Sequence, residues 1–572
     1  MALDAHASYR PAGIRFEPVA TPQKETLPRM DVAVFVGFAS KGRLHEPWLV
    51  ESIQEFTREF GEDLPLAWDW ERGEEVKACL APAVRSFFGN GGRRCWIIRV
   101  DDPVDDDGSA RFSANLFLDH DLKNMSTEQL LTQADFLRYQ SPAPRKLKGI
   151  HAALEIEEAT MIAVPDAVHL GWKFTRHDEP AVPGKSHPQC TPSYGNFNDC
   201  RPGELAVPFL HISPPDDKAG SFTLSWSKLP GAKYILEEAT RPDWSGAVVI
   251  YEGNKTALEL RGYPQGDYFY RVCAEVAGRR SDWSLGRQVQ ILQSKRWQQN
   301  SSKRYSSRSL LIIHRALLCM CAARGDMSAV LSMPAHFQES AALRHVRKLT
   351  STENMAKSAL SFASLYHPWL ISRDEGGRNR FRTVPPDGAI CGVMARRALS
   401  RGAWVAPANE AIKDVVALTP SILRESRLSL QESQINLIHR EPNGFIVLSA
   451  DTLCDDSDLR PINVRRLLIL IRKQALKKGT EYVFEPNDAS FRRMVQRGFE
   501  AMLDEMFLRG AFSGASPALA YQVATGSSAN TPQSVDQGRF IVELKVAPSK
   551  PMTFLTIRLM QTGDRMSIAE GA

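Results

Sequence analysis

The feature that most constrains the fold is a change of pattern inside the chain. Residues 218–292 contain short alternating runs of polar and apolar residues, separated by Pro-Gly, Gly-Asn, Pro-Gln-Gly and Ala-Gly turns. Short strands at regular spacing with such turns are typical of a β-sandwich. On both sides of this region, helical patterns alternate with buried strands. The sequence therefore predicts an α/β (α+β) body with an all-β domain inserted into it.

Composition narrows the class of protein. The chain has 572 residues, of which 43% are hydrophobic and 24% charged, so it is long enough and apolar enough to bury several cores. Lys and Arg number 71 against 66 for Asp and Glu, a net charge of +5. This excess is too small over such a length for a dedicated nucleic-acid binder, and we expect no nucleic-acid partner.

Two further observations concern the compartment. The first residues contain no apolar run of the secretory type, and the nine cysteines are an odd number, which favours free thiols in a reducing compartment. The best membrane candidate is 310–323. It is too short to span a bilayer and contains His314 and Arg315, so we expect a buried helix and no membrane insertion.

Hydrophobic periodicity predicts the elements of the body. Helical spacing is found at 50–60, 76–88, 128–139, 149–157, 310–324, 389–401, 464–478 and 488–509. Buried strands are predicted at 32–37, 95–100, 159–164, 327–333, 415–419, 444–448, 540–546 and 552–559.

Eight segments are predicted, from shifts in composition and pattern and, for the boundary at 461, from the family resemblance described below. These are an extended arm (1–28), the first part of the core (29–175), a linker (176–217), the β-sandwich (218–292), a second linker (293–309), the second part of the core (310–460), a C-terminal domain (461–547) and a strand arm with tail (548–572).

No motif in the sequence proposes catalysis. The glycines at 89–92 follow a helix and precede a strand, the reverse of a phosphate-binding loop, so they are interpreted as a helix end. His187, Cys190 and Cys200 match no common zinc spacing. Nucleophile elbows, zinc-protease motifs and dinucleotide fingerprints are absent from the sequence. We therefore expect no enzyme activity, no metal and no cofactor.

The order of several motifs resembles contractile tail sheath proteins. The motifs are YRPAGI at 9–14, VFVGF at 34–38, FFGNGGRRCW at 87–96, PINVRRL at 461–467, FEPN at 484–487 and QGRFIVE at 537–543. The resemblance covers roughly 1–175 and 310–560, and its C-terminal block is the most specific. It implies the sheath of a phage-tail-like contractile injection system.

The inserted region resembles a fibronectin type III module. Trp226 fits the early core tryptophan, Tyr268 and Tyr270 lie in the strand that would hold a tyrosine corner, and Trp283 lies in the exit motif SDWS. These four aromatic residues are the predicted core of the insertion. Its polar flanks predict a module that folds by itself and faces outward.

The sheath resemblance implies a mechanical function. Subunits of that family form hexameric rings stacked helically around an inner tube, between a baseplate and a cap, and collapse to drive the tube through a target envelope. Assembly in the cytoplasm of the producing cell is implied, whether the particle is then released or anchored. The alternatives are a sheath-related cap or baseplate component and a hydrolase with a fibronectin module. The hydrolase would need a secretory signal and a catalytic constellation, and the sequence offers neither.

The residue patterns, taken together with the sheath resemblance, predict two contact sites. The chain ends are predicted to join neighbouring subunits by strand addition, through Tyr9, Ile14 and Phe16 at one end and Phe554 and Ile557 at the other.

The helix at 488–509 is predicted to contact the inner tube through Arg492, Arg493 and Arg497. Its apolar face contains Phe491, Met494, Val495, Phe499, Met502, Leu503 and Met506. Two alternatives remain open. The arginines could pair with Glu500 and Asp504 on their own helix, or the tube could bind a stripe of Arg466, Lys473 and Lys477 on the preceding helix.

Overall fold

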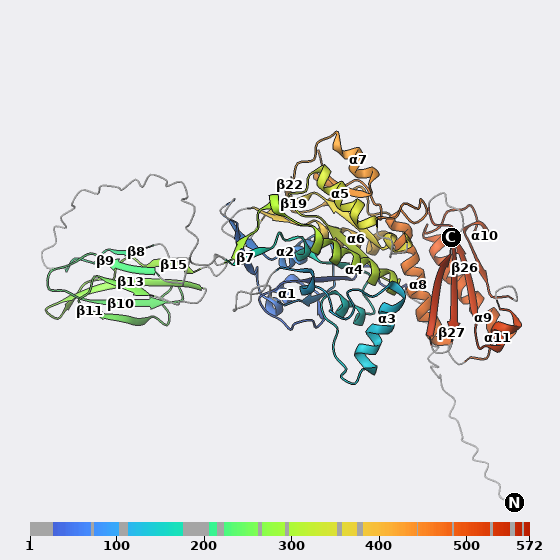
Figure 1. Ribbon diagram of the computed structural model, residues 1–572, viewed down its shortest axis with the longest axis horizontal. Coiled ribbons are helices and arrows are strands. Elements are labelled where there is room, and N and C mark those ends of the chain that lie inside the picture. The colour runs from blue at the N-terminus through green and yellow to red at the C-terminus, as the bar shows by residue number, and fades with distance from the viewer. Residues whose placement is uncertain are drawn as a thin grey trace, which may run out of the picture.

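The structure is a computed structural model. It describes residues 27–69, 72, 74–101, 112–174, 205–213, 222–260, 266–291, 297–351, 357–373, 381–442, 444–482, 485–526, 530–549, 555–562 and 565–571. Figure 1 shows a body between two smaller domains, with the all-β domain at one end and the C-terminal domain at the other.

A nine-stranded sheet organises the body, in the order β2-β5-β1-β6-β17-β18-β23-β24-β21. The strands from β5 to β23 in this order run parallel. Strands β2 and β24 run antiparallel to them, and the outermost strand β21 pairs antiparallel with β24. The bounds are β1 Ala33–Gly37, β2 Trp48–Val50, β5 Cys95–Arg99, β6 Met161–Ala163, β17 Ser328–Ser332, β18 Ala363–His367, β21 Glu410–Ile412, β23 Ile435–Glu441 and β24 Gly444–Val447.

Helices cover both faces of this sheet, as a parallel sheet requires. Val34 and Val36 of β1 face a core shared with α4 and α8, whereas Ala33 and Phe35 face a core shared with α1, α2 and α6. The helices of the body are α1 Ile53–Phe60, α2 Leu80–Gly89, α3 Thr127–Asp135, α4 Arg308–Arg324, α5 Glu339–Thr350, α6 Asp387–Arg401 and α7 Ser426–Glu432.

The two parts of the body form one sheet across the insertion. β6 precedes the all-β domain in sequence and β17 follows it, yet Ala329 of β17 pairs directly with Ile162 of β6. A second sheet, β4-β3-β16-β7, holds the two connections to the insertion together: β7 Trp172–Phe174 leaves the body and β16 Trp297–Gln299 returns to it, paired antiparallel. The other members are β3 Pro65–Asp69 and β4 Glu74–Lys77, and a third sheet contains β19 Trp369–Arg373, β20 Phe381–Val384 and β22 Val415–Thr419.

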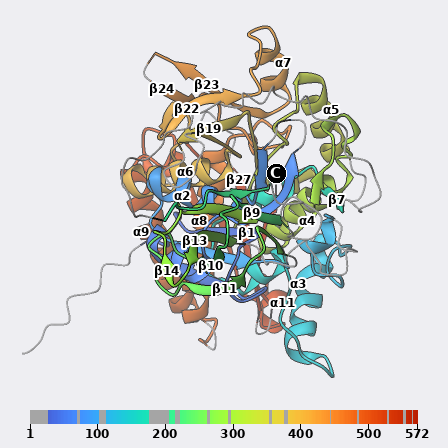
Figure 2. The ribbon, with the colours of Figure 1, turned by 90° about the vertical axis from the view of Figure 1, so that its left-hand side faces the viewer.

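The all-β domain contains two sheets that share one core, in which Leu224, Tyr234 and Val272 are buried. One sheet has the order β11-β10-β13-β14, with β15 also paired to β13, and the other has the order β12-β9-β8. The strands are β8 Leu210–Ile212, β9 Phe222–Trp226, β10 Lys233–Ala239, β11 Val248–Gly253, β12 Ala257–Leu260, β13 Gly266–Val276, β14 Arg279–Arg280 and β15 Arg287–Ile291. Figure 2 shows this domain in front of the body when viewed from its own side.

The C-terminal domain packs two long helices beside a four-stranded antiparallel sheet, β25-β26-β27-β28 (Figure 1). Helix α8 Ile462–Tyr482 is also part of the body core, so the domain is joined to the body by more than its chain connection. The remaining elements are α9 Ala489–Leu508, α10 Pro517–Ala520, β25 Tyr521–Ala524, α11 Pro532–Asp536, β26 Ile541–Val546, β27 Leu555–Thr562 and β28 Arg565–Gly571.

Several sequence expectations need correction. The helix expected at 76–88 begins only at Leu80, because Glu74–Lys77 pairs with β3 as strand β4. The expected linker 176–217 contains β8, which belongs to the all-β domain. The expected linker 293–309 contains β16, with Trp297 buried, and the start of α4. The expected C-terminal tail contains a further strand, β28. Elements of three residues, such as β8 and β16, are too short to show a period in the sequence.

Other expectations agree with the structure. Helix α2 ends at Gly89, and Gly91 adopts φ +103°, so the glycine cluster is a helix end. The apolar segment at 310–323 lies in α4 and packs into the body core. Among the described helices, none has the length and hydropathy needed to cross a bilayer.

Candidate functional site

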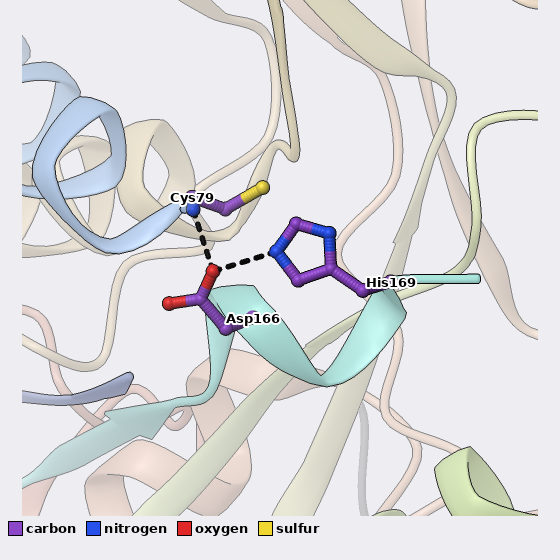
Figure 3. A group of neighbouring side chains, drawn as sticks. All are labelled: Cys79, Asp166 and His169. Atoms are coloured by element: carbon purple, nitrogen blue, oxygen red, sulfur yellow. Dashed lines mark hydrogen bonds and ion pairs between the residues drawn. The ribbon is translucent and has the colours of Figure 1, made fainter. Parts of the chain in front are cut away.

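The described residues bring one group of potentially reactive side chains together: Cys79, Asp166 and His169 (Figure 3). Asp166 is the second residue of a 3-10 turn, Pro165–Val168, that follows β6, and Cys79 precedes α2. The carboxylate of Asp166 accepts hydrogen bonds from the backbone N–H of Cys79 (2.6 Å) and of Phe38 (2.9 Å), and His169 Nε2 lies 2.8 Å from its Oδ1. All three side chains are buried.

This group is suited to holding the fold together and poorly suited to chemistry. Burial, with the nearby Asp166 carboxylate, raises the pKa of the Cys79 thiol well above its usual value, so the thiolate needed for attack or for metal binding is disfavoured. Two backbone N–H groups and a histidine already occupy the carboxylate. No local sequence pattern indicates this group, because Cys79 lies 87 positions before Asp166.

Helix α9 has the polarity that its sequence predicts, with one exception. The Asp488 carboxylate caps it by accepting a hydrogen bond from the Phe491 N–H at 2.7 Å. Six of the seven predicted apolar positions are buried, but Met494 is 53% exposed. Met494 therefore lies beside the arginines on the outer face, and its place in the predicted apolar face is wrong.

The three arginines of α9 differ in their surroundings. Arg493 and Arg497 are exposed, and no described carboxylate forms an ion pair with either. Arg492 is half-buried and donates from Nε to Asn487 Oδ1 at 2.7 Å. The structure thus leaves Arg493 and Arg497 available on the surface and holds Arg492 at the helix start.

Both alternatives to this contact surface meet difficulties. Glu500 accepts a hydrogen bond from Gln496 at 2.8 Å, and Asp504 accepts one from the Tyr521 hydroxyl, so neither pairs with the arginines. Arg466 is 3% exposed and donates to the backbone carbonyl of Met30 at 2.5 Å. Lys473 is occupied by Asp326 at 3.1 Å. The described residues therefore show no internal pairing of the arginines with Glu500 or Asp504, and of the stripe on α8 only Lys477 is exposed.

The predicted strand arms are only partly within the described residues. Tyr9, Ile14, Phe16 and Phe554 lie outside them. Ile557 lies in β27, where it pairs with Leu544 of β26 on one side and Glu570 of β28 on the other. The expectation that this strand has a free edge is wrong, because the chain itself occupies both edges. The outer strands of the sheet are β25 and β28.

The aromatic residues of the insertion divide into two groups. Trp226, Tyr268 and Tyr270 are buried. Trp283 is half-exposed and lies against the guanidinium of Arg271, 4.5 Å from its ring centre, with Trp244 on the same guanidinium at 4.4 Å. Trp283 thus belongs to a cation–π stack at the surface of a sheet, and its place in the predicted core is wrong.

The cysteines and the zinc candidates complete the search for reactive groups. Burial raises the pKa of Cys321 and of Cys391, as expected for inert core thiols, and the seven cysteines within the described ranges are all unpaired. His187, Cys190 and Cys200 lie outside the described residues.

Comparison with known proteins gives the C-terminal region a family. Residues 455–562 match the phage tail sheath C-terminal domain, a segment that comprises α8, α9 and strands β25 to β27. The tail sheath protein of Vibrio phage KVP40 is 28% identical over 199 residues, which are 34% of this chain and 28% of the phage protein. The tail sheath protein of Enterobacteria phage T4 is 26% identical over 188 residues, which are 32% of this chain and 27% of that protein.

The chain spans less than a third of the length of these curated relatives. A solved chain from the anti-feeding prophage baseplate in its contracted state aligns over 96% of this chain and 97% of its own length, at 15% identity and a TM-score of 0.53. At that identity the similarity shows a shared fold. The C-terminal part of the chain is therefore similar to tail sheath proteins, and the chain as a whole shares a mixed α/β fold with this baseplate chain.

Proposed function

We propose that this chain is the sheath subunit of a contractile injection particle, which polymerises around an inner tube and contracts to drive that tube through a target envelope. One observation carries the proposal: the tail sheath match covers 455–562, and these residues form the domain that carries the exposed face of α9. The work is mechanical, and the free energy for it resides in contacts between subunits.

The body has the rigidity that such a subunit needs. Its central sheet is covered on both faces, and its two halves are tied by direct strand pairing across the insertion. Helix α8 extends from the C-terminal domain into the body core, so the domain and the body are connected by packing as well as by the chain. A subunit of this kind can rotate as a unit while its surface contacts exchange.

Subunits are joined by strand addition in this proposal. Edge strands present unpaired N–H and C=O groups and bind a further strand readily. In this chain β25 and β28 are the outer strands of the C-terminal sheet. The N-terminal arm of a neighbour, including Tyr9, Ile14 and Phe16, would add at one of them. The polymer consists of six-subunit rings that associate with tube, baseplate and cap proteins.

The inner tube binds the exposed face of α9. Arg493 and Arg497 have no ion-pair partner among the described residues, and Met494 is exposed beside them. Exposed ion pairs contribute at most about 1 kcal/mol each, so many along a tube hold it while each releases easily. An acidic tube surface fits this face. Arg492 supports the contact from the helix start.

The inserted domain is an outward-facing accessory module of the fibronectin type III kind. Its two sheets enclose a core of their own, and Figure 1 shows it at one end of the molecule, away from the C-terminal domain. The β7–β16 pair forms the base of the inserted domain, so the central sheet of the body does not depend on that domain.

A cap or baseplate component is the second candidate, because the solved chain with the matching fold comes from a baseplate. Electron microscopy of the purified full chain tests the choice. Long hollow tubes are expected from a sheath subunit. Single rings or discs that never stack would instead identify a cap or baseplate part, and monomers at high concentration would contradict both. Assembly within the producing cell is part of the proposal.

A further inference from the structure

A basic cavity lies in the body, away from the surfaces discussed above. It has a volume of about 880 Å³ and lies between the first turns of α4, helix α5 and the segment 302–307. Five cationic side chains and two histidines line it: Lys303, Arg308, Arg315, Arg344, Lys348, His336 and His345. No aspartate or glutamate is among its lining residues. This volume lies in the range typical of small-molecule sites.

The cations of this cavity lack carboxylate partners. Elsewhere in the body, the half-buried cations Arg324 and Lys473 are paired with Asp326. In the cavity, Arg315 is half-buried and the other four cations are exposed. In the cavity, no described carboxylate forms an ion pair with any of the five, and Arg315 donates only to the backbone carbonyl of Lys348 at 2.5 Å. Its buried Nε has no hydrogen-bond partner among the described atoms. Like charges gathered without a counter-charge repel one another, and an anion bound between them offsets this repulsion.

A buried histidine supplies a second, independent sign of a ligand. His345 is 2% exposed, and its Nε2 lies 3.2 Å from Nδ1 of His314, which is equally buried. Its Nδ1 is buried and has no partner among the described atoms. If His314 donates to Nε2, the neutral ring of His345 carries its proton on Nδ1 and can donate it to an anion. Buried donors of this kind are rarely left unsatisfied.

The charge density selects the class of ligand. An extended acidic peptide places one carboxylate about every 3.4 Å, so matching five cations takes at least five residues. A chain of phosphates places as much charge in a much smaller volume, and guanidinium groups bind phosphate oxygens in pairs. Tyr305 and Phe337 add an aromatic wall, with ring centres 5.8 Å apart.

We infer that the cavity between α4 and α5 binds an oligophosphate, a small molecule with several phosphate groups in a row. Arg308 and Arg344 hold the phosphates from the two helices, and His345 donates from Nδ1 at the bottom of the cavity. The ligand neutralises the cluster and joins the start of α4 to α5. This inference is independent of the sheath function, because the cavity shares no residue with α9 or the C-terminal sheet.

Titration calorimetry of the full chain with sodium triphosphate tests the inference, at neutral pH and near-physiological salt. One triphosphate is expected per chain. Arg344→Gln removes a charged hydrogen-bond partner and is expected to weaken binding about tenfold or more. Arg347→Gln is the matched control, because Arg347 is an exposed arginine of the same helix that does not line the cavity. His345→Phe is expected to weaken binding as well.

Two ligand arms identify the source of the phosphates. Tighter binding of ATP than of triphosphate would indicate a nucleotide with its base on the aromatic wall, whereas equal affinities would indicate an inorganic chain. The inference is overturned if no heat of binding is measured, or if Arg344→Gln and Arg347→Gln weaken binding equally, since the effect is then general surface charge. Stronger and equally Arg344-dependent binding of the acidic peptide DDPVDDD, residues 101–107 of the chain, would also overturn it in favour of a peptide site.

Discussion

Asp166 and Cys79 lie 87 positions apart in the sequence, yet the carboxylate of Asp166 accepts a hydrogen bond of 2.6 Å from the Cys79 N–H. The same carboxylate accepts from Phe38 at the end of β1, so it links the first strand, the start of α2 and the segment after β6. There is no room for a side chain in front of it: a Cβ on Gly37 would lie 2.3 Å from Asp166 Oδ2. Asp166 and Gly37 therefore fix the carboxyl edge of the central sheet.

We expect Asp166→Ala to destabilise the body by about 2–4 kcal/mol, because it leaves two buried N–H groups without acceptors. Asp166→Asn keeps one acceptor oxygen and is expected to cost less. Gly37→Ala should also destabilise, since its Cβ displaces the carboxylate. Calorimetric unfolding measures all three, with Asp536→Ala at an exposed position as the control. An unchanged transition for Asp166→Ala would show that the carboxylate is not a structural tie.

The pH dependence of stability follows from buried groups with opposing effects. Burial lowers the pKa of His151, His345 and His367 from 6.5 to about 4, so between these values the unfolded chain binds more protons than the folded chain. Their contribution is present above pH 6.5 and is lost as the pH falls toward 4. Burial raises the pKa of Asp387 from 3.8 to about 7, so its contribution is present at low pH and is lost as the pH rises through 7.

Three histidines outweigh one aspartate, and we expect the melting temperature to fall between pH 6.5 and pH 4. Asp387→Asn removes the opposing group while keeping an acceptor for the Gly388 N–H. The stability of this variant minus that of the parent chain should be larger at pH 8 than at pH 5. Asp536→Asn, at an exposed position, serves as the control. Equal effects at both pH values would contradict the assignment of Asp387 as the opposing group.

The sequence predicts an element well where one period dominates. The strand expected at 415–419 is β22, and the helix expected at 488–509 is α9, with six of its seven predicted apolar positions buried. Met494 shows the limit of hydrophobic periodicity, because an apolar residue at the margin of the apolar face of a helix can lie on either face. The Asp166–Cys79 contact could not be predicted, since neither residue has a local pattern that points to the other.

Strand pairing between distant segments was also beyond the sequence. Nothing local to β6 shows that its neighbour is β17, on the far side of an inserted domain. Strand β28 lies in the segment for which the sequence predicts a tail. Its pairing with β27 shows that the chain itself covers the edge of β27 that strand addition would need. The cations around the α4–α5 cavity are likewise brought together by packing, because Lys303 precedes α4 and Lys348 lies in α5, with β17 between the two helices in the chain.

Removal of the inserted domain tests its independence. Phe174 of β7 faces Trp297 of β16 in an antiparallel pair, so a short Asn-Gly turn can replace residues 175–296 and close the two strands as a hairpin. We expect the melting transition of the body to be retained and the chain to assemble as before. The isolated domain, residues 205–291, should unfold in a transition of its own. Loss of the body transition after removal would show that the module is part of the body fold.

Deletion of residues 1–20 tests strand addition between subunits. Because these residues precede β1, we expect the chain to keep its circular dichroism and melting temperature but to lose polymerisation in electron micrographs. Removal of the inserted domain is the matched control, since it deletes more of the chain and should leave polymers intact. Tubes of normal length from the shortened chain would contradict the role of the arm.

Charge reversal on α9 tests the contact with the inner tube. Arg493 and Arg497 are exposed and unpaired within the described ranges, so changing both to Glu alters the charge of the outer face without removing an ion pair or hydrogen bond between described residues. If the tube surface is acidic, each reversal replaces an attraction of up to about 1 kcal/mol by a repulsion, repeated along the whole tube. Particles with this variant should show empty or prematurely contracted sheaths, and the fraction of filled, extended sheaths counted in electron micrographs measures the effect.

Arg401→Glu, at an exposed arginine that ends α6, is the control for charge reversal at the surface. Extended sheaths on filled tubes at the normal fraction, from a variant whose melting temperature is unchanged, would refute the assignment of α9 to the tube.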